Sequence, residues 1–538
     1  MSTVIEIQER YARQLSPAPG SAEEIAEFHA LQMKMPRMFE YVSKNRQSEH
    51  TSVIVPSMTL HKEELLKLKG AIYYEERLLY LLMLLRRPRT KLIFVTSKQI
   101  HQSIVDYYLH LLTGVPASHA RKRLILLDTN DNSNTPLSQK ILERPMLMHR
   151  IKSSIRDKEN AHLVTFNTTP LERTLSVQLG IPLYGLDPQL LDLGSKSGCR
   201  EIFREAGIPM PAGFERLRTT ADIVDALSEL WQMRPEIKRA VVKLNEGFSG
   251  EGNAIFDYRD IMPAKALNSA ERKKIIEDKL VTGLKYEAAS ETWESFAQKF
   301  YNMGGIVEEF IEGEVKRSPS VQCRVNAIGE PQVISTHDQL LGGPSGQVYL
   351  GCTFPADSSY RMMIQDYGDT IAKVLAKKGV IGRFAVDFVV VKKNNDWDCY
   401  AIEINLRKGG TTHPFLMMKF LTDGRYDRES GLFLTSSGHP RYYLASDNLT
   451  SPNYKGVSPD DLIDIAVYHD LHFHSASERG VVFHLIGAMS EFGKLGVTCI
   501  GKSPKDAQKL YDDILEVLDK ETSGGWTKRH DSLKNVMF

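Results

Sequence analysis

The chain has 538 residues, of which 42% are hydrophobic and 25% are charged, and its 68 basic and 67 acidic side chains give a formal net charge of +1. This apolar content excludes a mainly disordered protein, because enough surface can be buried to offset the chain entropy. The balanced charge argues against nucleic acid or an anionic membrane as a partner. At roughly 150 residues per domain, the length predicts three or four domains.

The cysteines and the apolar segments of the sequence indicate the cellular compartment of the protein. Its five cysteines lie far apart without a CxxC pair, which is typical of reduced thiols in a cytosol. Residues 1–15 are polar and charged and lack the apolar stretch of a secretory signal. The longest apolar run, residues 78–85, is too short to cross a bilayer and predicts a buried helix. We therefore expect a cytoplasmic protein without a membrane-spanning segment.

Strand-like and helix-like segments alternate in the first third of the chain. The strand candidates are residues 91–96, 123–128, 163–166 and 181–184, and residues 99–112 carry apolar side chains at helical spacing. Such alternation favours a parallel sheet covered by helices. This part is therefore predicted to be an α/β domain.

From Ser195 onward the pattern changes to one helix followed by strand pairs. Residues 195–206 predict a helix that ends at Gly207. The expected strand pairs lie at 240–244 with 253–256, at 321–336 around Gly329, and at 383–392 with 399–406, while 264–299 predicts an exposed helix and the tail from about 457 a small α/β unit.

A lysine and a glycine-rich turn lie together in the segment AVVKLNEGFSGEGN. A strand delivers Lys243, and a turn with Gly247, Ser249, Gly250 and Gly252 follows it. Glycines let backbone N–H groups approach a phosphate closely, and the lysine adds a positive charge. The segment is not a Walker A loop, because no GKS or GKT ending follows. A plain hairpin turn with an exposed lysine is the alternative.

Two later strands carry oxygen ligands. Asp387 lies in an otherwise apolar strand, and Glu403 and Asn405 share one face of the next strand, because side chains alternate with a period of two. If the strands are neighbours, the three side chains converge in a site that suits Mg²⁺ together with nucleotide phosphates. The alternative is a structural salt bridge between Asp387 and Arg383.

Positive charge follows directly in the segment NLRKGGTTHP. Arg407 and Lys408 precede Gly409 and Gly410, and an arginine in this place is suited to bidentate binding of a carboxylate or an acyl phosphate. His413 is a candidate proton shuttle or substrate contact, and a structural histidine at a helix start is the alternative.

An apolar stretch that becomes acidic is the last candidate element. In GGIVEEFIEGE, residues 304–314, the backbone can offer hydrogen bonds to adenine and a carboxylate can approach ribose hydroxyls. An exposed acidic turn is the alternative.

Together and in this order, these segments resemble the ATP-grasp superfamily. The matching features are a lysine at the start of a helix (Lys196), a lysine before a glycine-rich loop (Lys243), the hinge at 308–311, and the metal strands with their E-x-N-x-R ending. The segments EINLRKGGTTHP and GVVFHLIGAMSEFGKLGVTCIGKSPKDAQ resemble peptide ligases of the kind found in pheganomycin biosynthesis. The resemblance covers most of the chain.

This resemblance implies a fold of the α/β (α+β) class, with an ATP-grasp fold behind a Rossmann-like α/β domain. We expect the leading domain at 1–188, the glycine-rich ATP-grasp subdomain at 189–315, the metal-binding subdomain at 316–438 and a C-terminal α/β unit at 439–538.

The resemblance also implies roles for residues of this chain. The residues implied to bind ATP are Lys196, Lys243, Gly247, Ser249, Gly250, Gly252, Glu308, Glu309, Phe310, Ile311 and Glu314. Those implied to bind Mg²⁺, or Mn²⁺ in its place, are Asp387, Glu403 and Asn405, and Arg324 and Arg407 are expected to contact the γ-phosphate or an acyl phosphate.

The activity implied by the resemblance is ATP-dependent ligation of a carboxylate to an amine. A small, amino-acid-like carboxylate is activated as an acyl phosphate and captured by an amine or peptide acceptor, with release of ADP and phosphate. Positive side chains and Mg²⁺ are the stabilisers that such a phosphoryl transfer needs. A phosphotransferase with a stable phosphorylated product and a non-catalytic ATP-binding scaffold are the alternatives, since fold alone does not decide.

Several points stay open. The base for the amine is His413 or Glu246, and residues 341–349 are either a lid or an ordinary loop. The histidines of HDLHFH, residues 469–474, lack a completing ligand, so we expect no metal there. No motif encodes the two substrates or the oligomeric state, a homo-oligomer included.

Overall fold

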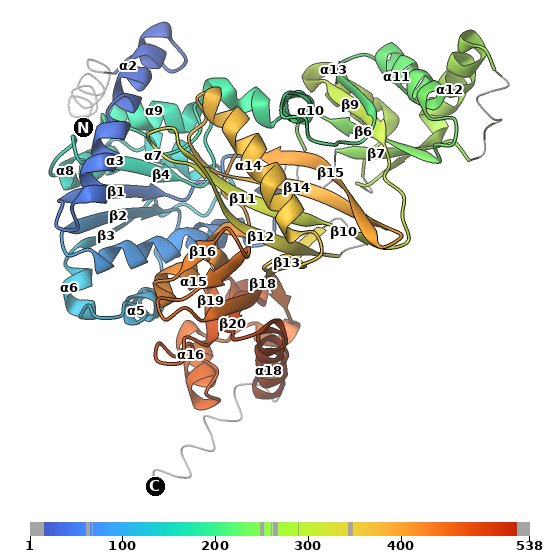
Figure 1. Ribbon diagram of the computed structural model, residues 1–538. Helices are drawn as coiled ribbons and strands as arrows, with labels where there is room; N and C mark the ends of the chain where they lie inside the picture. Colours follow the sequence, from blue (N-terminus) through green and yellow to red (C-terminus); the bar gives the residue numbers. More distant parts are fainter. Residues whose placement is uncertain are drawn as a thin grey trace.

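The computed structural model describes residues 16–60, 65–66, 68–247, 252–259, 261, 267–288, 290–342 and 348–523. Three sheets organise these residues: one of four strands, one of five and one of eleven. Figure 1 shows the four-stranded sheet on one side of the molecule and the five-stranded sheet standing away from it on the other, with the large sheet between them.

The first domain is a parallel sheet with the strand order β3-β2-β1-β4. Its central strands are buried on both faces, as expected for parallel strands covered by helices. The predicted α/β domain is confirmed. The strands are β1 (His50–Val55), β2 (Thr90–Thr96), β3 (Leu124–Asp128) and β4 (Ala161–Thr165). The helices are α2 (Ala22–Gln32), α3 (Met35–Lys44), η1 (Ala71–Arg86), α5 (Gln102–His110), α6 (Ala117–Arg121), α7 (Leu137–Leu142), α8 (Pro145–Ser154) and α9 (Pro170–Leu179).

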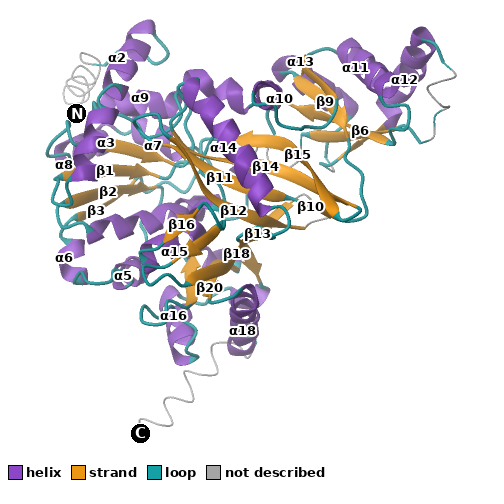
Figure 2. Ribbon diagram, viewed as in Figure 1, coloured by secondary structure: helices purple, strands orange, loops and turns teal. Residues whose placement is uncertain are grey.

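The five-stranded sheet has the order β5-β9-β6-β7-β8 and a hydrophobic core of its own, with Trp231, Phe256 and Phe296 fully packed inside it. Figure 2 shows its helices gathered around this small sheet. The strands are β5 (Gly213–Leu217), β6 (Arg239–Leu244), β7 (Asn253–Asp257), β8 (Leu284–Tyr286) and β9 (Gly305–Glu309). The helices in and before this unit are η2 (Pro188–Gly194), α10 (Lys196–Glu205), α11 (Thr220–Met233), α12 (Ser269–Gly283) and α13 (Trp293–Met303).

The eleven-stranded sheet extends through the rest of the chain. Its main path is β10-β14-β11-β12-β13-β18-β17-β16, with β15 beside β14 and β20 between β18 and β19. The strands are β10 (Lys316–Arg317), β11 (Pro319–Val325), β12 (Pro331–Gly342), β13 (Val348–Phe354), β14 (Gly382–Lys393), β15 (Asp396–Asn405), β16 (Arg425–Asp427), β17 (Leu432–Leu434), β18 (Pro440–Thr450), β19 (Gly480–His484) and β20 (Lys494–Gly501). The helices are α14 (Arg361–Lys377), α15 (Thr412–Thr422), η4 (Pro452–Tyr454), α16 (Pro459–Tyr468), α17 (Gly487–Phe492) and α18 (Pro504–Thr522).

The C-terminal segment shares its sheet and its core with earlier parts of the chain. Its strand β18 pairs with β13, and one hydrophobic cluster contains Tyr80 of η1, Phe415 of α15 and Leu510 of α18. The boundary expected after Gly438 therefore lies between two strands of a single sheet.

Residues 78–85 lie in the 3-10 helix η1 and are mostly buried, which confirms the predicted buried helix. Two segments differ from the expected elements. Residues 181–184 contribute only the single bridge between Leu163 and Leu183. The predicted helix at 264–299 is divided, because β8 adds an edge strand between α12 and α13.

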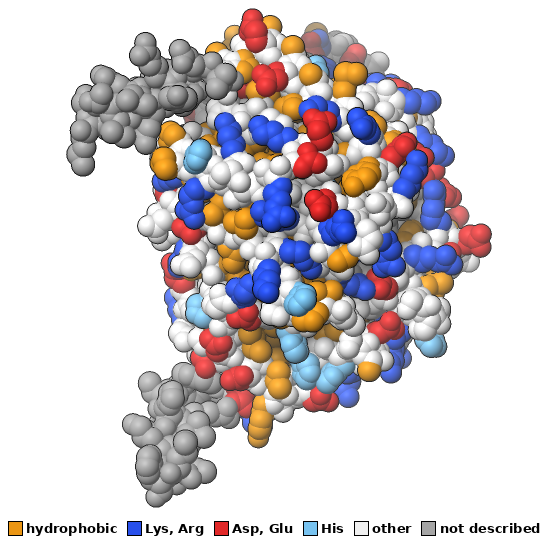
Figure 3. Space-filling model, turned by 90° about the vertical axis from the view of Figure 1, so that its left-hand side faces the viewer, with side chains coloured by type: hydrophobic (Ala, Val, Ile, Leu, Met, Phe, Trp, Pro, Cys, Tyr) orange, Lys and Arg blue, Asp and Glu red, His pale blue; other side chains and the backbone are white. Residues whose placement is uncertain are grey.

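The distribution of charged side chains on the surface and the length and polarity of the helices agree with the composition. Over the face shown in Figure 3, acidic and basic side chains are interspersed rather than gathered by sign. In the part of the chain that the structure describes, the helices are too short or too polar to cross a membrane.

Candidate active site

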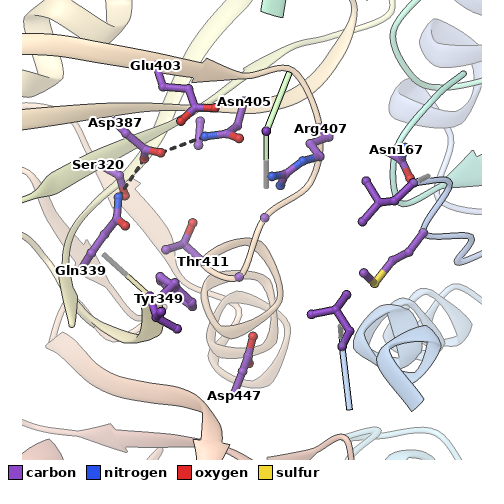
Figure 4. Close-up of a pocket in the computed structure, with 18 of the residues that line it drawn as sticks. Asn167, Ser320, Gln339, Tyr349, Asp387, Glu403, Asn405, Arg407, Thr411 and Asp447 are labelled. Carbon is purple, nitrogen blue, oxygen red and sulfur yellow. Dashed lines mark hydrogen bonds between the residues drawn. The ribbon is translucent and has the colours of Figure 1, made fainter. Parts of the chain in front are cut away.

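A cavity of about 420 Å³ is lined by residues of the five-stranded and eleven-stranded sheets and by segments of the first domain that lie outside its strands. The five-stranded unit contributes Lys243, and the large sheet contributes Asp387, Glu403 and Asn405. Figure 4 shows Glu403 and Asn405 on one side of this cavity, Arg407 pointing into it, and Asp447 at the opposite end. The strand geometry thus brings together the lysines, the metal strands and Arg407, which the sequence identified separately.

The three expected metal ligands converge because β14 and β15 are antiparallel neighbours. Asp387 pairs with Glu403 in the register, and the Asn405 Nδ2 donates a hydrogen bond of 2.8 Å to Asp387 Oδ2. The other oxygen of Asp387 accepts a hydrogen bond of 2.8 Å from Gln339 Nε2. Asp387 is thus paired with these amides, and the alternative salt bridge to Arg383 is not formed.

Electrostatics in this group favour a bound cation. Burial and the nearby charge of Glu403 raise the pKa of Asp387 to about 7, against the opposing charges of Arg407 and Lys196. Burial alone would also raise the pKa of Glu403, but Lys196, whose Nζ lies 2.5 Å from its Oε1, brings that pKa below its ordinary value. Two carboxyl groups with an amide oxygen beside them are a hard-oxygen donor set that fits Mg²⁺.

The two lysines are positioned by different devices. Lys196 is the first residue of α10, whose N-cap Ser195 accepts a hydrogen bond from the backbone N–H of Gly198. The side chain of Lys243 extends from β6 and lines the cavity, and its Nζ donates a hydrogen bond of 2.5 Å to Glu308. Both positive groups therefore face the region of the metal strands.

Two glycines of the glycine-rich segment line the cavity. They are Gly247 and Gly252, and a Cβ added to Gly247 would lie 3.4 Å from the Gly252 Cα. Ser249 and Gly250 lie outside the described residues, as do residues 343–347 of the expected lid.

The expected adenine hinge is not brought to the cavity wall. Glu308 is buried between Lys243 and Arg200, whose Nη1 donates to it over 3.0 Å. The Phe310 N–H donates to the Arg239 carbonyl and the Phe310 ring is covered by the Arg239 guanidinium, 3.9 Å from its centroid. Of the remaining hinge residues, Glu309 and Ile311 are half-buried and Glu314 is exposed.

The cationic residues after the metal strands separate into two groups. Arg407 lines the cavity, and burial lowers its pKa while Glu403 and Asp387 oppose that effect. Arg324 does not line the cavity: its side chain donates to Gln332 and it pairs in register with Arg383. Lys408 likewise turns away and donates to the Thr165 carbonyl. The expected contact between Arg324 and the transferred phosphoryl group thus has no support in this arrangement.

Neither candidate base lines the cavity. His413 is buried behind the wall, with its Nε2 3.3 Å from Asp447 Oδ1, and Glu246 is exposed. Burial and the neighbouring His484 lower the pKa of His413 to about 4. A neutral, enclosed imidazole fits a role in orienting Asp447 better than a role as proton acceptor for a substrate.

The three histidines between residues 469 and 474 do not gather in one group. Helix α16 ends at Tyr468, and His469 bonds to Glu521 over 2.9 Å instead. The rings of His472 and His474 do lie together, with centroids 4.0 Å apart, beside Asp470 on the surface.

Several cavity residues were not predicted from the sequence. Ser320 and Gln339 reach Asp387 because β11 and β12 follow β14 in the sheet order. Arg77, Asp447 and Lys494 come from segments far apart in the chain. For Gln339 an alternating strand pattern was an available signal, whereas the last three carry no local motif.

Comparisons with family models agree with this geometry. Residues 188–290 and 279–429 match a family described as IQCH-like, ATP-grasp, and residues 461–514 match the PGM1 C-terminal domain.

Two curated proteins and one solved structure are informative. L-propargylglycine–L-glutamate ligase of Streptantibioticus cattleyicolor is 30% identical over 443 residues, 81% of this chain and 87% of that protein. IQ motif-containing protein H of Danio rerio is 23% identical over 93% of this chain, which spans 51% of that protein. The biotin carboxylase domain of Hydrogenobacter thermophilus 2-oxoglutarate carboxylase, solved with MgADP, ADP and bicarbonate, has a TM-score of 0.52 at 13% identity and covers 87% of this chain and 89% of its own.

The likeness to the carboxylase domain shows the fold, and the 30% identity over most of both chains shows the family. On these grounds the chain belongs to the ATP-grasp ligases, in the same family as L-propargylglycine–L-glutamate ligase.

Proposed function

We propose that this enzyme joins a small carboxylic acid to an amine through an acyl phosphate, with ATP converted to ADP and phosphate. The observation that carries the proposal is the convergence of Lys243, Asp387, Glu403, Asn405 and Arg407 in one cavity. The chemistry requires several negative oxygens to approach one another, and positive groups fixed in advance stabilise that arrangement.

In this proposal ATP lies between the five-stranded unit and the large sheet. Lys196 and Lys243 contact its phosphates, with Gly247 and Gly252 beside them, and the base lies toward residues 308–311. Glu308 serves this site indirectly, since it holds Lys243. Arg324 is left out of the scheme.

Mg²⁺, with Mn²⁺ as a substitute, is the proposed metal and would be held by Asp387, Glu403 and Asn405. Such an ion supplies charge neutralisation to the phosphate oxygens. Arg407, which lines the same cavity, orients the incoming carboxylate toward the γ-phosphorus.

The proposed reaction has two bond exchanges. A carboxylate oxygen forms a bond to the γ-phosphorus as the bond to the bridging oxygen of ADP breaks. The amine nitrogen then forms a bond to the acyl carbon, the phosphate leaves with the original carboxylate oxygen, and the amine releases a proton.

The substrate class follows from the relative. Its name gives two amino acids, L-propargylglycine and L-glutamate, as the compounds it joins. We therefore propose an amino-acid-like acid and an amino acid or peptide amine for this chain, acting in the cytoplasm.

An oxygen-transfer experiment tests the mechanism. With an acid labelled by ¹⁸O in its carboxylate, the released phosphate is expected to carry one ¹⁸O, and the product is expected to contain a new amide by mass spectrometry. Unlabelled phosphate would exclude the acyl phosphate. A stable phosphorylated product in place of an amide would instead indicate a phosphotransferase.

Two variants on the same strand connect this activity to the site. Glu403→Gln is expected to reduce turnover at least about a hundredfold, because a metal ligand and the partner of Lys196 are lost together. Asp398→Asn is the control: its carboxylate is 45% exposed and only pairs with Lys393 over 3.5 Å. Equal activity of the two variants would remove Glu403 from the scheme.

A further inference from the structure

The end of the cavity opposite the metal strands is built from segments that no nucleotide motif covers. The 3-10 helix η1 supplies Tyr74 and Arg77, β18 supplies Asp447, and β20 supplies Lys494. Figure 4 shows Asp447 across the cavity from Glu403. This end therefore has its own recognition chemistry.

Asp447 presents a charged carboxylate there. Its Oδ1 lies 2.6 Å from His484 Nε2 and 3.3 Å from His413 Nε2, and Arg77 hydrogen-bonds to its Oδ2. Burial alone would raise the pKa of Asp447, but the charge of Arg77 and the neighbouring His413 and His484 hold it well below its usual range. The side chain is thus a buried anion.

The same three groups, His413, Asp447 and His484, have the spacing of a metal site. A guanidinium already bonded to the carboxylate opposes a second cation at that point, because like charges repel strongly in a buried place. The histidines therefore orient the carboxylate toward the cavity.

Two cations at this end of the cavity contact the same aromatic ring. The Arg77 Cζ lies 4.1 Å from the centroid of the Tyr74 ring and the Lys494 Nζ lies 5.1 Å from it, with a hydrogen bond of 2.7 Å from Lys494 to the Tyr74 hydroxyl. The Arg77 Nε is buried without a hydrogen-bond partner. Among the described residues no carboxylate forms an ion pair with Lys494. Arg77 and Lys494 thus have hydrogen-bond donors available at this end of the cavity to bind an anion.

The first domain also contributes apolar side chains to the cavity. These are Met58, Leu60, Leu68 and Phe166. A ligand that satisfies all these groups has an ammonium, a carboxylate and an apolar side chain.

We propose that this subsite binds a free α-amino acid with an apolar side chain, with its ammonium on Asp447 and its carboxylate on Lys494 and Arg77. The proposal rests on the proposed function for its place in the reaction: Lys494 and Arg77, not Arg407, bind the carboxylate of this amino acid, so it supplies the amine and not the activated acid.

Binding of L-norvaline, measured by calorimetry, tests the subsite without turnover. The wild-type chain is expected to bind L-norvaline at least tenfold more tightly than L-norvalinamide, which lacks the carboxylate charge, and pentanoate, which lacks the amine. Lys494→Met is expected to lose the preference over the amide, and Asp447→Asn the preference over pentanoate.

Lys98→Met is the matched control. Lys98 makes the same contacts with the next tyrosine, 2.9 Å to the Tyr73 hydroxyl and 5.2 Å to its ring centroid, but outside the cavity and beside Glu491. It is expected to discriminate as the wild type does.

The outcomes separate this subsite from the reaction. Equal discrimination by Lys494→Met and Lys98→Met, or no binding of L-norvaline to the wild type, would overturn the subsite. Discrimination that follows the expected pattern in a protein that forms no amide would keep the subsite and reject the proposed function.

Discussion

Glu308 shows how one buried carboxylate organises the nucleotide side of the cavity. Its two oxygens accept hydrogen bonds from Lys243 and Arg200, and its side chain is almost inaccessible to water. Removing one member of such a group leaves an uncompensated buried charge, which costs more than the pair itself contributes. The charge of Glu308 is therefore needed to keep Lys243 in place.

We expect Glu308→Gln to lower the free energy of unfolding by about 3 kcal/mol and to weaken Mg–ATP binding. Glu309→Gln is the control on the next position of β9, where the carboxylate is 27% exposed and 3.8 Å from Arg234, and it is expected to cost less than about 1 kcal/mol. Urea unfolding measures the stability of both variants, and nucleotide titration measures binding by Glu308→Gln. Equal losses of stability in the two variants would contradict the buried-charge argument.

For single residues, the sequence predicts those functional side chains that belong to a local sequence pattern. Asp387, Glu403 and Asn405 were found because a period of two fixes the face of a strand, and the register then brought them together. Asp447 and Lys494 were not found, since their importance arises only when β18 and β20 meet the first domain.

At the scale of elements, the local hairpins were predictable and their order in the sheet was not. The strand pair β14–β15 follows from two apolar runs around a polar turn, but β14 lies between β10 and β11. That order depends on contacts between segments far apart in the chain, which propensities do not report. The edge strand β8 was missed for the same reason, since only pairing with β7 makes residues 284–286 a strand.

His337 links two elements of the large sheet that are not neighbours. On β12, its Nε2 lies 2.7 Å from the hydroxyl of Tyr443 on β18, across β13, and its side chain is fully buried. Burial lowers the pKa of His337 to about 3. Because the folded pKa lies below the unfolded value, this histidine contributes stability above pH 6.5 that is lost as the pH falls toward 3.

We expect the free energy of unfolding of the wild type to fall by about 2 kcal/mol more than that of His337→Phe between pH 7.5 and pH 5. Other titrating groups cancel in this difference. His439→Phe, at an exposed position before β18, should keep the pH dependence of the wild type. If the free energy of unfolding had the same pH dependence in the wild type and in His337→Phe, protonation of His337 would not destabilise the fold, and the prediction would be wrong.

At the scale of the whole molecule, the five-stranded unit and the C-terminal segment are of nearly equal length but differ in whether they have a hydrophobic core of their own. The five-stranded unit has its own core and its ends meet, because the Glu309 N–H donates a hydrogen bond of 2.7 Å to the Ala212 carbonyl. The C-terminal segment has neither property, since its strands continue the large sheet and its apolar side chains complete a core that contains Tyr80 and Phe415. Fold class was predictable from the order of elements, but this sharing of a core was not.

Two deletions test this difference. Replacing residues 213–308 by a short glycine linker between Ala212 and Glu309 is expected to leave a protein that unfolds in a single cooperative transition but no longer binds ATP. Ending the chain at Gly438 is expected to abolish the cooperative transition and to expose apolar surface, because β18 and α18 are removed from the common core. Thermal unfolding and binding of a hydrophobic dye measure both outcomes. If the shortened chain unfolded cooperatively and bound no dye, the C-terminal segment would be a separate domain after all, and the lining of the cavity by Asp447 and Lys494 would have to arise from docking of two folded units.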